Sequence, residues 1–257
     1  MKYSSVRTKL NVTLMLTFTV GIFLLLVKLG LWQLDKGQNK QVWQQQLQIK
    51  QAANPLQWQE LQQLKDNYHG YYADLATLTS RAPLIILDNQ ILQGQVGYRV
   101  FEIREQAHGD SAILVELGFV GANANRQQLP QLMRLPAEAR LQGRLYQKQT
   151  NRLSHALDSE LMMDGSGQQS VVRIQNLNLP QLADQLGLAL LPAILLPTQL
   201  AQPDWPRVWQ SPPISVEKHF GYALQWFVMA LVFAGLVIRL GWLQHKNSKE
   251  REHAKQQ

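Results

Sequence analysis

Two long apolar runs stand near the two ends of the chain. The first covers residues 10–32 and carries no charge until Lys28, whose side chain can reach the membrane interface. The second covers residues 220–238, which at helical rise span roughly 28 Å, close to the ~30 Å hydrocarbon core of a bilayer. We therefore predict two transmembrane helices, at residues 10–32 and 219–242.

The first run could also be a cleaved signal peptide. It is longer than the ~7–15 apolar residues of a signal core, and no A-x-A-like cleavage site directly follows it. We therefore expect it to be retained as an anchor. The few residues before it leave little room for a mitochondrial presequence, which favours a bacterial inner membrane.

The charge distribution predicts the orientation of these spans. The formal net charge is +7, with Lys2, Arg7 and Lys9 before the first run and a basic tail at 245–257 after the second. This is the pattern of the positive-inside rule rather than of a nucleic-acid-binding face. We expect cytoplasmic ends at residues 1–9 and 243–257, and a periplasmic segment at 33–218.

The middle of the chain predicts a mainly antiparallel β (α+β) domain. One segment, 179–188, has the pattern of a short helix with Pro180 near its start and Gly187 near its end. The apolar run 190–200 contains two prolines and is predicted to be at best an edge strand, whereas 155–165 is predicted to be a short helix or turn. Five segments have strand character: 82–91, 97–103, 111–120, 139–147 and 169–177.

Two connecting segments leave alternatives open. The Gln-rich stretch 38–63 is either a helix that continues from the first span as far as Pro55 or a solvated spacer. The Pro- and Trp-rich stretch 202–215 leads into the second span. Its Trp205 and Trp209 either rest on the membrane surface or close the core of the β domain.

The chain contains no cysteine, which excludes disulfides, thiolate catalysis and cysteine-ligated metals. Phosphate-binding loops, dinucleotide fingerprints, HExxH and GxSxG are absent as well. His69, His108 and His155 are isolated in polar sequence, and Asp158 and Glu160 are expected to be solvated. We find no catalytic constellation and predict that the protein is not an enzyme.

Two motifs at the membrane ends carry a resemblance to a known family. The stretch "LGLWQLDKGQNK" (29–40) resembles the G-x-W-Q motif of the Surfeit locus protein 1 family, and "KHFGYALQWF" (218–227) resembles its H-x-x-Y-A-x-x-W-F motif. Lys36 stands where the family usually has Arg. The mid-domain R-G-W motif is replaced by Leu117-Gly118-Phe119, which marks a divergent member, although Arg126 can match a later family Arg.

The resemblance implies an assembly factor for a haem–copper terminal oxidase that acts on subunit I, with haem A synthase as a further partner. It also implies a haem a site in which His219 is the ligand to the iron. Tyr222, Trp226, Trp32 and Gln33 are the neighbouring candidates. The client could be either a cytochrome c or a quinol oxidase, and a cofactor-free membrane scaffold is the alternative function.

The residues themselves allow the same site. On a helix, His219, Tyr222, Ala223 and Trp226 lie on one face. A neutral imidazole is a good haem-iron ligand, and Ala223 would leave room for a porphyrin. Trp32 and Gln33 emerge at the same side of the membrane and could form the opposite wall. The alternative is that His219 has no binding role. It would then be a solvated residue at the membrane boundary, beside Tyr and Trp side chains of the interfacial aromatic belt.

Overall fold

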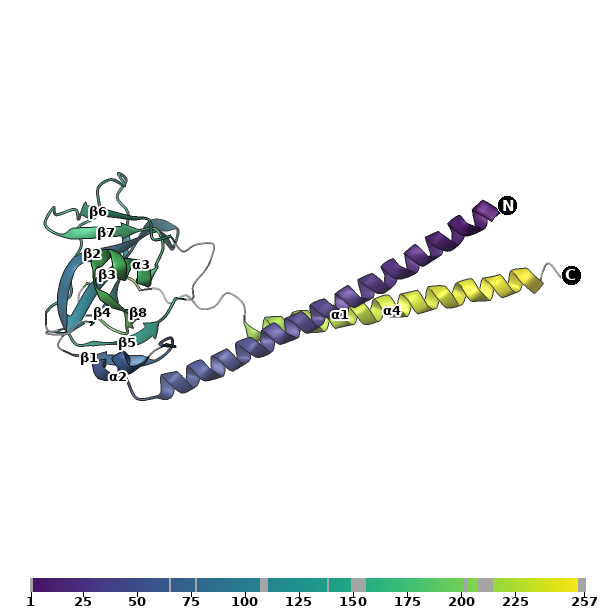
Figure 1. Ribbon diagram of the computed structural model, residues 1–257, viewed down its shortest axis with the longest axis horizontal. Helices are drawn as coiled ribbons and strands as arrows, with labels where there is room; N and C mark the ends of the chain where they lie inside the picture. Colours follow the sequence, from purple (N-terminus) through teal and green to yellow (C-terminus); the bar gives the residue numbers. More distant parts are fainter. Residues whose placement is uncertain are drawn as a thin grey trace. The chain divides into compact units, whose positions relative to one another are not determined.

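The computed structural model describes residues 2–64, 66–76, 78–106, 111–137, 139–148, 156–200, 203–207 and 215–253. The chain divides into two compact units. One contains residues 46–210 and holds the β-sheet. The other contains residues 1–45 and 211–257 and holds most of the two long helices (Figure 1).

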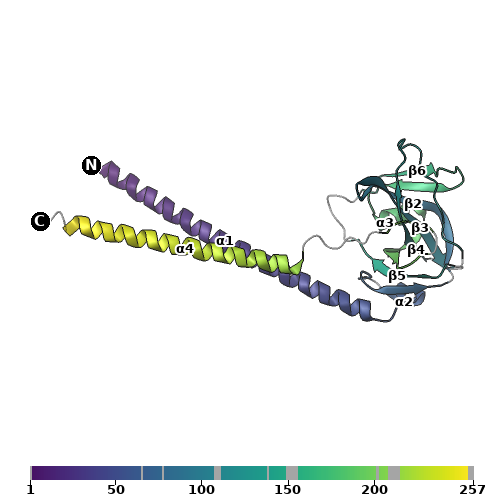
Figure 2. The same ribbon diagram turned by 180° about the vertical axis from the view of Figure 1, so that it is seen from behind.

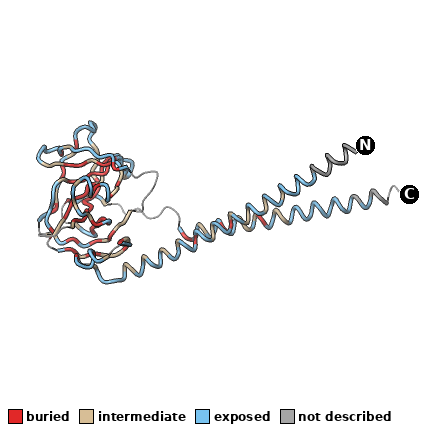
Figure 3. Tube along the Cα trace, in the orientation of Figure 1, coloured by how far each residue is buried: buried red, intermediate tan, exposed pale blue. Residues whose placement is uncertain are grey.

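The two long helices are α1, Lys2–Ala52, and α4, Val216–His253. Both are long and apolar enough to cross a membrane. Many of their residues are exposed, as the pale blue along both helices shows in Figure 3. Large apolar side chains are among them, including Phe18 at 69% and Ile238 at 72%. Helix α1 runs without a break through the Gln-rich stretch to Ala52, so the helical alternative for that stretch is confirmed as far as Ala52, and most of its residues are exposed.

The other unit contains one eight-stranded sheet in the order β1-β5-β8-β4-β3-β2-β7-β6. Its pairings are antiparallel except for β2 with β7 and β4 with β8, so the sheet is mixed, although antiparallel pairs predominate. The strands are β1 Tyr72–Leu75, β2 Leu78–Leu92, β3 Gln95–Gln106, β4 Ser111–Gly121, β5 Leu141–Tyr146, β6 Ser159–Met163, β7 Ser170–Ile174 and β8 Ala189–Pro197. All five predicted segments contain a strand: 82–91, 97–103 and 111–120 lie within β2, β3 and β4, whereas β5 and β7 are shorter than the predicted 139–147 and 169–177.

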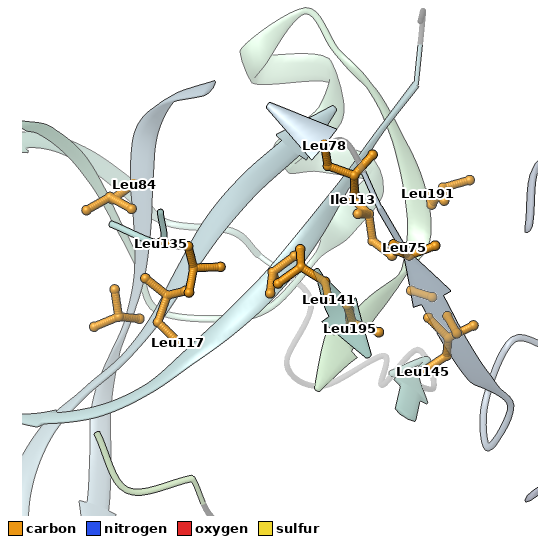
Figure 4. Close-up of a cluster of buried hydrophobic side chains, with 14 of the residues drawn as sticks. Leu75, Leu78, Leu84, Ile113, Leu117, Leu135, Leu141, Leu145, Leu191 and Leu195 are labelled. Carbon is orange, nitrogen blue, oxygen red and sulfur yellow. The ribbon is translucent and has the colours of Figure 1, made fainter. Parts of the chain in front are cut away.

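Side chains alternate between two apolar cores on the two faces of the sheet. On β2, Leu84 and Ile86 join one core, whereas Ile85 and Leu87 join the other. Figure 4 shows part of the first core, where leucines from several strands converge. Burial on both faces explains why the central strands read as continuous apolar runs.

Two short helices cover these cores. Helix α2, Trp58–Gln63, buries Trp58 and Leu61 in the first core, and α3, Leu179–Leu186, contributes Leu182 to the second. Helix α3 begins where the Asn178 side chain accepts a hydrogen bond from the Gln181 N–H. It ends at Gly187, whose φ of 62° is left-handed. The helix predicted at 179–188 is therefore confirmed, and its local start and stop signals are sufficient to form it.

Two predictions about strands were wrong. Strand β8 is central, between β5 and β4, because Pro192 falls at a register shift between the pairs Ala112–Leu190 and Leu114–Ile194, where no ladder hydrogen bond is required of it. Its second proline, Pro197, is the last residue of the strand. Residues 159–163 form a strand rather than a helix or turn, because pairing with β7 overrides the helical propensity of Leu and Met.

The connector that precedes α4 docks on β4. The Phe119 N–H donates to the Pro206 carbonyl at 2.8 Å, and Trp205 packs against the first core. Of the two alternatives for Trp205, closing the core of the β domain is the one the structure shows. Trp209 lies outside the described residues, as do His108 and His155.

Candidate functional site between the long helices

Helices α1 and α4 pack closely because glycines of α1 face phenylalanines of α4. A Cβ atom placed on Gly30 would lie 2.6 Å from Cε1 of Phe227, and one on Gly37 would lie 2.8 Å from Cε1 of Phe220. The two contacts are seven residues apart on each helix and run in opposite directions along the chain. The helices are therefore antiparallel and side by side over this stretch, as Figures 1 and 2 show.

Small or branched residues of α4 fill the rest of this seam. Val216, Ala223 and Ala230 are each no more than 6% exposed and repeat every seven residues. A seven-residue repeat keeps one stripe of a helix on its partner over several turns. We call the contact between this stripe and the Gly30–Gly37 face of α1 the glycine seam.

The N-terminal end of α4 adds an electrostatic contact to the seam. Glu217 lies in the first helical turn, where a carboxylate complements the positive end of the helix dipole. Its carboxylate accepts hydrogen bonds from its own backbone N–H and from Ser215, and the positive charge of Lys40 on α1 attracts it. These interactions favour the start of α4 beside α1.

A polar pair lies at the edge of the glycine seam. Nδ1 of His219 is 2.8 Å from Oε1 of Gln33, and both side chains are half-buried. His219 stands one residue before Phe220, and a Cβ on Gly37 would lie 3.3 Å from its Cβ. The close approach of the two backbones therefore brings these side chains within hydrogen-bonding reach.

The hydrogen bond between them has a direction. An amide oxygen can only accept, so Nδ1 of His219 carries the proton in this arrangement. The neutral ring then has an unprotonated Nε2 with a free electron pair. This is the form in which an imidazole binds a metal ion or accepts a further hydrogen bond.

The sequence model of the SURF1 family matches residues 20–231, which is most of the chain and includes both sides of this pair. The chain belongs to the SURF1 family. This family is associated with membranes and with cytochrome oxidase assembly. A search among curated proteins found no significant match.

The other predicted site residues of this SURF1 chain are distributed differently. Trp226 is half-buried and stands seven residues after His219, on the same flank of α4. Trp32 is 51% exposed and Tyr222 is 48% exposed, so both side chains point largely away from the glycine seam. Ala223 does not leave room for a porphyrin here, because it is 2% exposed and packed within the seam.

The donor set would suit a group that needs one protein ligand rather than a multidentate metal site. No group of three or more His, Asp or Glu side chains is placed to hold a metal ion among the described residues. Haem iron needs only one or two protein ligands, and an imidazole oriented by a hydrogen bond at its other nitrogen is a suitable one. His219 fits that role by its chemistry.

Sequence reasoning missed the residues that bring this pair together. Gly30, Gly37, Phe220 and Phe227 were not singled out as a set. The signal was present as two glycines and two phenylalanines, each pair with seven-residue spacing, in two helices predicted to span the same membrane. Small residues at helix contacts are typical of membrane proteins, where close backbone approach replaces the hydrophobic effect as the source of affinity.

Proposed function

We propose that this SURF1-family protein is a membrane-anchored, non-enzymatic assembly factor that presents haem a to subunit I of a haem–copper oxidase, with Nε2 of His219 as the iron ligand. The observation that carries the proposal is the His219–Gln33 hydrogen bond at 2.8 Å, within the segment matched by a family associated with cytochrome oxidase assembly. Bound haem a would supply the iron centre that the oxidase requires.

The protein's own residues have distinct roles in this proposal. His219 holds the iron, and the half-buried Trp226 on the same flank of α4 offers an aromatic surface to the porphyrin. The exposed ring of Tyr222, one turn after His219, is placed where a client protein or lipid can contact it. Haem A synthase is the expected donor of the cofactor.

The proposed topology follows from the two apolar helices. Both cross the bacterial inner membrane, with their basic outer ends in the cytoplasm and the sheet unit in the periplasm. Apolar side chains that are exposed along α1 and α4, such as Leu14 and Leu231, face lipid in this arrangement. His219 and Gln33 then lie at the periplasmic boundary of the bilayer, where haem and client can meet.

The test is the absorption spectrum of the full-length protein purified in detergent from cells that make haem A. The wild type is expected to contain haem a, and His219→Ala is expected to lose it or to shift its bands. His245→Ala removes an exposed histidine from the same helix and serves as the matched control, with an unchanged spectrum expected. A deletion strain is expected to lose oxidase activity while still synthesising the subunits, and normal oxidase spectra in that strain would contradict the assembly role.

A cofactor-free scaffold is the second candidate function. It is favoured by the burial of Ala223, because the helix pair closes the space that a porphyrin was expected to use. In this case His219→Ala has no effect on oxidase assembly, and haem is absent from wild type and variant alike. Capture of subunit I by the tagged full-length protein would then identify the protein–protein role.

A further inference from the structure

We propose that Gln33 is a positioning residue that holds His219 in the Nδ1–H tautomer and so makes Nε2 the nitrogen that binds iron. That Nε2 binds haem iron rests on the proposed function, whereas the tautomer of His219 does not. Gln33 then orients His219 rather than forming a wall of the haem site. It acts through His219 and need not touch the cofactor.

The backbone geometry makes this hydrogen bond a consequence of helix packing. Gln33 lies between Gly30 and Gly37 on α1, three residues after one and four before the other, and so shares their face of the helix. Phe220 and Phe227 rest on those glycines. The spacing between the helices is therefore set on both sides of Gln33, which fixes the distance from its amide to the ring of His219.

The choice of an amide as acceptor also has a chemical reason. A carboxylate at this position would be costly near the hydrocarbon region and would favour the doubly protonated imidazolium, which cannot bind a metal. A hydroxyl donates or accepts through one and the same atom, whereas an amide accepts through its oxygen and donates through its nitrogen. The oxygen, Oε1, is the atom of Gln33 that lies 2.8 Å from Nδ1, and in this orientation it selects the Nδ1–H form while the ring stays neutral.

The direct test is ¹⁵N NMR of histidine-labelled, full-length protein in lipid nanodiscs at about pH 8, where an ordinary imidazole is neutral. Protonated and unprotonated ring nitrogens have well-separated shifts. The signals of His219 are identified among the six histidines by their loss in His219→Ala. The wild type is expected to show a protonated Nδ1 and an unprotonated Nε2.

Two substitutions separate the acceptor from the packing of the side chain. Gln33→Met keeps a similar length and removes the acceptor, so the ring is expected to lose its preference for Nδ1–H. Gln33→Glu keeps an oxygen that accepts from Nδ1, so a protonated Nδ1 is expected to persist. Gln225→Met makes the same change at an exposed glutamine of α4 and is expected to leave His219 unaltered. Circular dichroism of each variant establishes that the helices are retained.

A haem titration provides the second measurement. With ferric protoporphyrin IX as the probe, Gln33→Met is expected to weaken binding about 10–100-fold, as is usual when the hydrogen-bond partner of a metal-ligating His is lost. Gln225→Met is expected to bind as the wild type does.

The outcomes distinguish this inference from the proposed function. Unchanged His219 nitrogen signals in Gln33→Met would overturn the inference even if the protein binds haem. Loss of the protonated Nδ1 in Gln33→Glu as well as in Gln33→Met would also overturn it, because packing rather than the acceptor would then set the tautomer. The expected tautomers without any haem binding would support the role of Gln33 and reject haem presentation.

Discussion

The ring of Phe227 lies against the backbone of Gly30, so closely that a Cβ on this glycine would be 2.6 Å from the ring. At this distance a side chain on residue 30 requires the helices to move apart or the ring of Phe227 to turn away. In a membrane, where lipid tails are as apolar as Leu, close packing of this kind is a main source of helix association. The Gly30–Phe227 and Gly37–Phe220 contacts therefore hold α1 and α4 together.

Gly30→Leu is expected to separate the helices around the His219–Gln33 pair, because the added side chain collides with the ring of Phe227. Gly235→Leu is the control, since a Cβ at Gly235 meets no atom within 4 Å. The cysteine-free chain allows spin labels at Lys28→Cys and Val228→Cys, both exposed, and the distance between the labels can be measured by electron spin resonance. An unchanged distance distribution in Gly30→Leu would contradict a role for this contact.

A buried ion pair ties a loop to the sheet. The side chains of Glu102 and Arg104, both on β3, are fully buried and 3.4 Å apart at their closest charged atoms. Glu102 also accepts from the Leu135 N–H at 3.0 Å, and Arg104 donates to the Leu78 and Leu135 carbonyls at 2.9 and 3.0 Å. These bonds hold the 129–136 segment over the first core.

Glu102→Gln is expected to lower the free energy of unfolding by about 3–5 kcal/mol, because it leaves the charge of Arg104 buried without its partner. Glu105→Gln breaks the Arg81–Glu105 pair, whose side chains are 45% and 25% exposed, and is expected to cost less than about 1 kcal/mol. Urea denaturation of the full-length protein in detergent measures both. Equal effects of the two substitutions would show that burial of the first pair is unimportant.

Gly118 occupies the position of the mid-domain family motif and has a backbone φ of 139°, which L-residues rarely adopt. A Cβ here would lie 2.6 Å from Cβ of Trp205. Gly118→Ala is expected to cost about 1–3 kcal/mol of stability through strain and to loosen the connector from β4. Gly167 also has a positive φ, but a Cβ there meets no atom within 4 Å. Gly167→Ala therefore measures the effect of backbone strain without a clash. Similar losses in thermal unfolding for both variants would mean that the Trp205 contact contributes little.

The sheet unit is expected to lose stability as the pH falls below about 6.5, because of His69. Partial burial, followed by the charges of Lys50 and Arg144, lowers the pKa of His69 in the folded state. The unfolded chain therefore takes up a proton before the folded chain does as the pH falls. The stability contributed by neutral His69 is fully present above the pKa of His69 in the unfolded chain. It is lost as the pH falls through the lower pKa of the folded state.

His69→Gln is expected to reduce the difference in thermal midpoint between about pH 7.5 and about pH 5. The pKa values of Asp66, Asp74 and Asp164 are lowered from an ordinary value of 3.8, so they change stability at more acidic pH. The same pH dependence in wild type and His69→Gln would assign the effect to other groups.

Local signals in the sequence were enough for much of the fold. Apolar runs of membrane length, five strand segments and the start and stop signals of α3 at Asn178 and Gly187 all correspond to structure, because each depends on neighbours within a few residues. The motif residues His219 and Gln33 were also recognisable from their neighbours in sequence.

Tertiary structure decided what those residues touch. The prolines of β8 favoured an edge position, yet a register shift at Pro192 makes the strand central. The pattern of residues 155–165 favoured a helix or turn, and pairing with β7 makes 159–163 a strand.

The contact between His219 and Gln33 joins residues 186 apart, and it depends on glycines and phenylalanines that meet only when two antiparallel helices pack. Local periodicity specifies which face of a helix is apolar, whereas the partner of that face, and hence the approach of Gln33 to His219, is set by packing between distant segments.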